Sequence, residues 1–76
     1  MHSPAVYEIR VQERLDAQWA SWLAPMTLRH TISGETVLTG RLRDQAELHG
    51  LLMKVRDLNL LLLEVKRVEP ERPHTA

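Results

Sequence analysis

Cysteine is absent from this sequence of 76 residues, which excludes disulfide bonds and thiolate metal sites. A chain of this length holds one core, and the burial of its apolar groups leaves little margin over the entropy lost on folding. Since neither disulfides nor thiolate-bound metals supply extra stability, self-association is the remaining supplement. A lack of cysteine also suits a reducing compartment, so we expect a cytoplasmic protein.

An excess of charge of one sign is also lacking, because ten Lys and Arg residues balance ten Asp and Glu residues. No long-range field therefore attracts nucleic-acid backbones or anionic lipid. The longest wholly apolar run covers only residues 60–63, far short of a membrane span, and residues 1–7 lack the pattern of a signal peptide. We expect neither a nucleic acid nor a membrane as partner.

Motifs that carry chemistry are missing as well. Two of the four histidines lie near the chain ends, and His30 and His49 alone are too few for a zinc site. The three glycines are isolated, so no phosphate-binding loop is present, and no serine lies in a nucleophile-elbow context. The run 36–42 has no aromatic residue to stack RNA bases. The sequence predicts no metal, no cofactor and no catalytic residue.

The first half of the chain predicts a strand, a helix and a hairpin. Residues 6–12 alternate between apolar and polar side chains, which indicates a half-buried strand. Residues 16–24 should form a helix, because bulky apolar side chains share one helical face before Pro25. These side chains are Leu15, Trp19, Trp22 and Leu23, and we expect both tryptophans to anchor the core. The runs 26–32 and 36–42 should pair as a hairpin.

The second half predicts a helix followed by a strand. Asp44 with Glu47 three residues later resembles the capping box that begins a helix. One face of this helix then carries Leu48, Leu51, Leu52, Val55 and Leu58. Asn59 tolerates the left-handed conformation that commonly ends a helix, and residues 60–68 resume as a strand rich in Leu and Val.

The element order β-α-β-β-α-β predicts an α+β fold of the ferredoxin-like, split βαβ kind. In this fold a four-stranded antiparallel sheet carries two helices on one face. We expect one domain over residues 6–68, an N-terminal tail over 1–5 and a disordered tail over 69–76, which is polar and contains two prolines. The side chains expected to face the helices are Tyr7, Ile9, Val11, Leu28, Leu38, Leu61, Leu63 and Val65.

The sequence resembles a widespread family of short bacterial proteins. The resemblance rests mainly on the segment DQAELHGLL at 44–52, on VRDL at 55–58 and on the apolar run 60–65. The opening YEIRV, the tryptophan pair and the dipeptide Thr39–Gly40 contribute to it. Asn59 departs from the pattern, which has glycine there. The family has no assigned activity, so the resemblance implies a bacterial source but no reaction, cofactor or catalytic residue.

The outward face of the second helix has a feature that local structure does not require. Gly50 falls in mid-helix opposite the apolar stripe, where it costs roughly 0.5–1 kcal/mol relative to alanine. Close approach of another helix would explain it, and the first helix also has small residues behind its tryptophans. The hypothetical partner interface comprises Ala46, His49, Gly50, Met53, Asp57, Ala17, Ala20 and Ala24. The alternative is that these side chains are merely tolerated, since alanine favours helices.

The sheet face without helices is a second candidate surface. By alternation it includes Arg10, Arg29, Arg41, Leu60 and Leu62. The leucines suit sheet-to-sheet dimerisation and the arginines suit a small anion, whereas an ordinary solvated face is the third interpretation.

These patterns favour a small non-enzymatic interaction module that is homo-oligomeric, with a second copy or another protein as its partner. The alternative is a small-ligand-binding or enzymatic subunit whose site forms between protomers. Its possible polar groups are His49, Asp57, and Arg41 or Arg56. Fold analogy alone supports that alternative.

Overall fold

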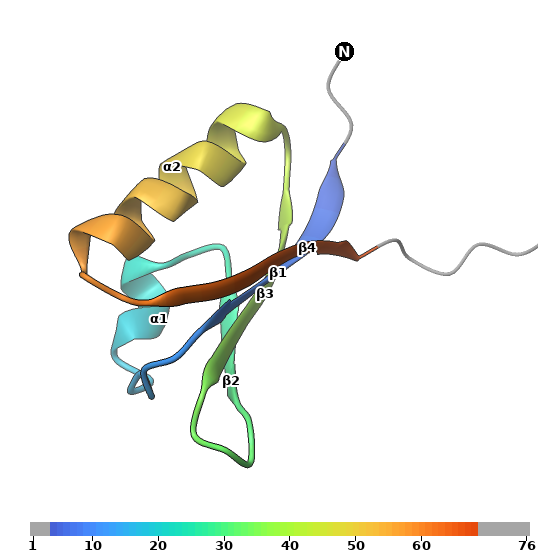
Figure 1. Ribbon diagram of the computed structural model, residues 1–76. Helices are drawn as coiled ribbons and strands as arrows, with labels where there is room; N and C mark the ends of the chain where they lie inside the picture. Colours follow the sequence, from blue (N-terminus) through green and yellow to red (C-terminus); the bar gives the residue numbers. More distant parts are fainter. Residues whose placement is uncertain (1–3, 69–76) are drawn as a thin grey trace, which may run out of the picture.

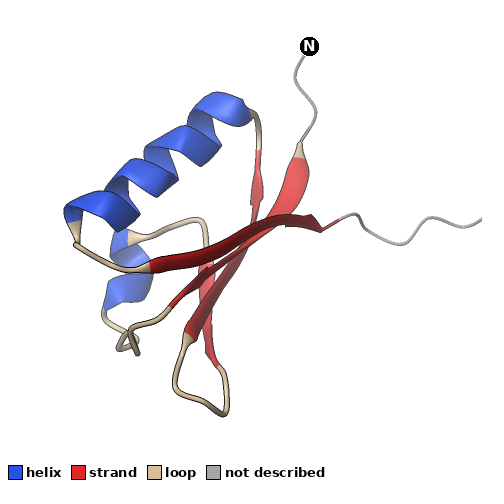
Figure 2. Ribbon diagram, viewed as in Figure 1, coloured by secondary structure: helices blue, strands red, loops and turns tan. Residues whose placement is uncertain are grey.

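The computed structural model describes residues 4–68 and has an α+β fold (Figure 1). Its four antiparallel strands follow the order β2-β3-β1-β4. The strands are β1 (Ala5–Val11), β2 (Thr27–His30), β3 (Thr36–Leu42) and β4 (Leu62–Val68). One long helix, α2 (Gln45–Asp57), packs on the sheet, and a short helix, α1 (Trp19–Trp22), follows β1 (Figure 2).

The structure begins β1 one residue before the predicted start of the domain at residue 6. Ala5, placed by the sequence in the N-terminal tail, is the first residue of β1 and is buried. The predicted tail at 69–76 lies outside the described residues.

The start of α2 is confirmed, and local hydrogen bonds fix it. The Asp44 carboxylate accepts a bond from the Glu47 amide at 2.9 Å. The Glu47 carboxylate in turn accepts from the Arg43 amide at 2.7 Å. This reciprocal pattern is a variant of the capping box, and it satisfies amides that the first turn leaves without helical partners.

The end of α2 also follows the prediction, because Asn59 has a φ of 59°. Its amide donates to the Arg56 carbonyl at 2.9 Å, and the Leu60 amide donates to the Val55 carbonyl at 3.1 Å. These two bonds form a Schellman motif. The motif turns Leu60 back against the core, so β4 begins at Leu62, two residues later than predicted.

The first helix is shorter than the predicted 16–24, since α1 covers only Trp19–Trp22. The residue before it, Gln18, makes no side-chain capping bond, and its first turn holds no acidic group. Nothing therefore offsets the high cost of starting a helix. The prediction that both tryptophans anchor the core is wrong for Trp22, which is 53% exposed. Trp19 is partly buried against the core.

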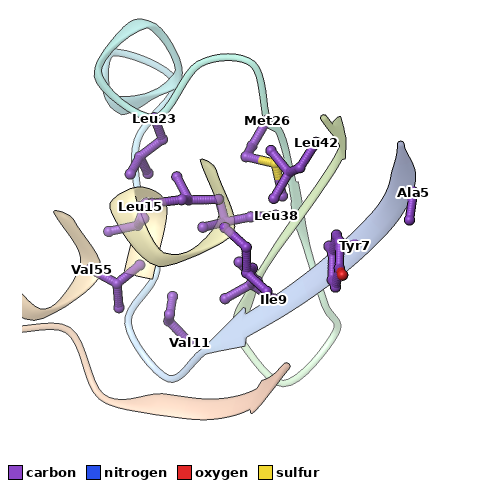
Figure 3. Close-up of a cluster of buried hydrophobic side chains, with 12 residues drawn as sticks. Ala5, Tyr7, Ile9, Val11, Leu15, Leu23, Met26, Leu38, Leu42 and Val55 are labelled. Atoms are coloured by element: carbon purple, nitrogen blue, oxygen red, sulfur yellow. The ribbon is translucent and has the colours of Figure 1, made fainter. Parts of the chain in front are cut away.

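The core lies between α2, β1, β3 and the segments on either side of α1 (Figure 3). The buried side chains are Ala5, Tyr7, Ile9, Val11, Leu15, Leu23, Met26, Leu38, Leu42, Leu48, Leu51 and Val55. None of them belongs to β4. A helix about 10 Å wide covers about two strands spaced about 4.8 Å apart. The single long helix therefore covers the central strands and leaves β4 uncovered.

The prediction of helix-facing side chains is confirmed for β1 and for Leu38, which are buried. Leu28 is half-buried against the core. The three remaining residues, Leu61, Leu63 and Val65, are exposed. The sequence predicted that two helices, the first over residues 16–24, would cover them, but α1 has only four residues.

Thr36 joins the loop after β1 to the sheet. Its side chain is wholly buried, with 0% exposure. The hydroxyl accepts a bond from the Leu15 amide at 2.9 Å and donates to the Glu13 carbonyl at 2.7 Å. These bonds place Leu15 in the core without a helical turn around it.

We expect Thr36→Val to lower the free energy of unfolding by about 1–3 kcal/mol, because it leaves the Leu15 amide and the Glu13 carbonyl without partners. Urea unfolding followed by tryptophan fluorescence measures the change. Thr39→Val, on the other face of β3, is the matched control. A loss no greater than that of the control would contradict this role for Thr36.

Candidate interaction surface

Ion pairs cross the open face of the sheet. Glu8 on β1 lies between two cations, Arg29 of β2 at 3.7 Å and Lys66 of β4 at 3.5 Å. These side chains are partly exposed, so each pair contributes about 1 kcal/mol or less. Their main effect is to neutralise the charges on this face.

A second set of pairs runs beside the first. Arg10 on β1 lies 3.8 Å from Glu35 and 3.5 Å from Glu64 of β4. Between the two sets, Val37 stands opposite both Arg10 and Arg29 in the strand register and is only 2% exposed. The long arginine side chains flank this valine, as the aliphatic parts of such side chains commonly do on apolar surface. The open face is thus largely covered by its own side chains.

Two residues predicted on the open face lie instead on the helix side. Leu60 packs against the core because the Schellman motif directs it there. Leu62 stands opposite the buried Val11, because the β1–β4 register shifts between Arg10 and Val11. Directly opposed residues share one face, so this irregularity moves Leu62 across the sheet. Arg41 is exposed on β3, opposite Val6.

The predicted interface residues of α2 are all exposed. They are Ala46, His49, Gly50, Met53 and Asp57. A Cβ atom built on Gly50 would meet nothing within 4 Å, so no contact among the described residues requires glycine there. The residues Ala17 and Ala24 flank α1 on either side, so they form no helix face with Ala20. The small-residue interface therefore stays a prediction for α2. The matching face predicted on the first helix is not formed, because α1 is too short to include Ala17 and Ala24.

Two hollows border α2. One, of about 240 Å³, is lined by Gly50 of α2 and by Ala24 and Pro25 of the segment before β2. The other is a shallow depression of about 350 Å³ on the opposite side of the helix. Its lining residues are His49, Leu52, Met53 and Arg56.

The four polar groups suggested for a shared site are only partly brought together. His49 and Arg56 line the same depression, and Asp57 lies 3.5 Å from Arg56. Arg41 belongs to the open sheet face. Within residues 4–68, no cluster of three or more potential metal ligands occurs. Neither helix between these limits is long and apolar enough to cross a membrane.

The sequence prediction placed Leu62 on an exposed face but missed the exposure of Leu61, Leu63 and Val65. Leu62, Leu63 and Val65 are 42%, 43% and 38% exposed, and the preceding Leu61 is 53% exposed. A signal was present, since residues 60–63 are consecutive leucines, whereas a strand covered on one face alternates.

The two sides of α2 have different neighbours. Lys54 donates to the Trp22 carbonyl at 3.2 Å, which places that side of α2 beside α1. Gln45, on the other side, donates to the Tyr7 hydroxyl of β1 at 3.1 Å. Leu52 lies on this second side, and Met53 lies beside it on the exposed face of α2.

We name the apolar residues on this side of the molecule the α2–β4 surface. They are Leu52, Met53, Leu61, Leu62, Leu63 and Val65. Leu52 and Met53 line the depression on α2. The β4 strand is the edge of the sheet next to β1 (Figure 1). Several exposed apolar side chains on neighbouring elements are typical of an interaction site.

Residues 6–66 match a family profile described as a domain of unknown function, DUF8691. The chain belongs to the DUF8691 family. The match spans both helices and includes most of β4, so the α2–β4 surface lies within the DUF8691 domain. The searches of curated proteins and of solved structures gave no match.

Two glycines of the DUF8691 domain should respond oppositely to alanine. Gly50→Ala should raise the free energy of unfolding by about 0.5–1 kcal/mol, because its Cβ meets open space and alanine favours the helix. Gly40→Ala should lower it by about 1–3 kcal/mol through overpacking, since its Cβ would lie 2.5 Å from Met26 Sδ and 3.1 Å from the Pro25 carbonyl oxygen. Thermal unfolding followed by circular dichroism measures both. Equal effects of the two substitutions would contradict this assignment.

Proposed function

We propose that this chain is a small non-enzymatic interaction module that self-associates through the α2–β4 surface. The observation that carries the proposal is the exposed apolar side of β4, which turns toward the helix layer but has neither of the two described helices over it. Apolar area of this kind is removed from water when a partner binds. In a chain this short, the same burial would supplement a small core.

We further propose that the fold is the ferredoxin-like, split βαβ kind with a shortened first helix. The strand order β2-β3-β1-β4 and the antiparallel pairing of every neighbouring pair support this assignment. The lack of cysteine supports a cytoplasmic location, and the sequence resemblance supports a bacterial source.

The self-association proposal is tested with the double variant Leu63→Thr/Val65→Thr. Threonine keeps a high strand propensity while removing apolar surface, so the monomer should stay folded. We expect the wild-type chain to sediment as an oligomer and the variant to sediment as a monomer at the same concentration. Sedimentation velocity measures the masses, and circular dichroism checks the fold.

The matched control is Ile32→Thr. Ile32 is fully exposed in the β2–β3 turn, away from the α2–β4 surface, so its replacement should leave the oligomer unchanged. A wild-type chain that stays monomeric at high concentration would refute self-association. An oligomer that survives the double variant would assign it to another surface.

A further inference from the structure

We infer that the partner is a second copy of this chain, joined by antiparallel pairing of the two β4 strands about a two-fold axis at Val65. This inference rests on the proposed function and gives it a geometry. The product is a continuous antiparallel sheet, twice as wide as the four-stranded sheet of one protomer, with both α2 helices on the same face.

The β4 strand has a free edge on which such pairing can occur. Among the described strands it pairs only with β1, and its other edge faces no strand of this sheet. It is seven residues long, whereas the opposite edge strand, β2, has four residues. Long edge strands add further strands readily, and a two-fold dimer is the commonest closed form of such an assembly.

The charges of β4 select one register. An axis at Val65 sets Glu64 of one protomer opposite Lys66 of the other, and this pair occurs twice by symmetry. An axis at Glu64 or at Lys66 would instead set two like charges directly opposite each other. Opposite charges across antiparallel strands stabilise pairing and like charges oppose it, so the Val65 register is favoured.

The same register joins the ion pairs of the two open faces into continuous rows. In each protomer, Lys66 already pairs with Glu8, and Glu64 pairs with Arg10. Across the axis, each row would alternate in sign at every step. In order, it runs Arg29, Glu8 and Lys66 of one protomer, then Glu64, Arg10 and Glu35 of the other. No charge in the row meets a charge of its own sign.

The helix-facing side of the seam is apolar at its centre. Val65 lies opposite Ile9 on β1, on the face that α2 packs against, and would lie beside its own symmetry copy. Neighbouring strands are about 4.8 Å apart, so the paired β4 side chains remove each other from water.

Charge reversal with mixing tests the register. Glu64→Lys alone and Lys66→Glu alone should each weaken homodimerisation by roughly tenfold or more, since both cross-strand pairs become repulsive. Mixing the two variants should restore dimers of one chain of each kind, because every seam pair is again of opposite sign. Sedimentation equilibrium gives the dissociation constants, and native mass spectrometry of an isotope-labelled partner identifies the mixed dimer.

The mixing result separates interface effects from folding defects, because each protomer carries the same internal change in the mixed dimer and in the homodimer. Arg41→Glu is the control: it reverses an exposed charge on β3, on the same sheet face but outside these rows and away from the seam, and should leave dimerisation within about twofold. If the wild type dimerises and both variants still dimerise, or if mixing the variants restores no dimer, β4 pairing is wrong but self-association is not refuted. A monomeric wild type overturns both.

Discussion

The width of a single helix is the constraint on which this structure depends. One helix of 13 residues lies across a sheet of four strands, and a helix covers only about two of them. The core therefore forms under α2 between β1 and β3, with Leu15, Leu23 and Met26 filling the space beside it. The strand farthest from this cover, β4, keeps its apolar side chains in water.

The two faces of the sheet are closed by different means. The helix side uses apolar burial, which is strong but needs a covering element. The open side uses charged side chains, which neutralise one another in cross-strand pairs and flank the buried Val37. The charged face is covered by its own side chains, whereas the β4 part of the apolar face is exposed. Interaction should accordingly follow the β4 edge rather than the arginines of the open face.

The features that local sequence predicts well are those fixed by neighbouring residues. Asp44 and Glu47 begin α2, and Asn59 ends it in the left-handed conformation, because capping bonds act within a few residues. The strand 36–42 appears as predicted. Of the α2–β4 surface, the sequence predicted the exposure of Met53, which follows from helical spacing, and that of Leu62, which it placed on the other sheet face.

By itself, the sequence determined the order of the elements and most of the buried stripe of α2, since these depend on periodicity and residue type. Tertiary structure decided the length of α1, the register irregularity beside Val11 and the exposure of β4. Burial of a strand depends on what lies above it. The elements that cover a strand come from residues distant in the chain. Here the Thr36 hydroxyl bonds to the backbone at Glu13 and Leu15, and the segment that follows forms only one helical turn.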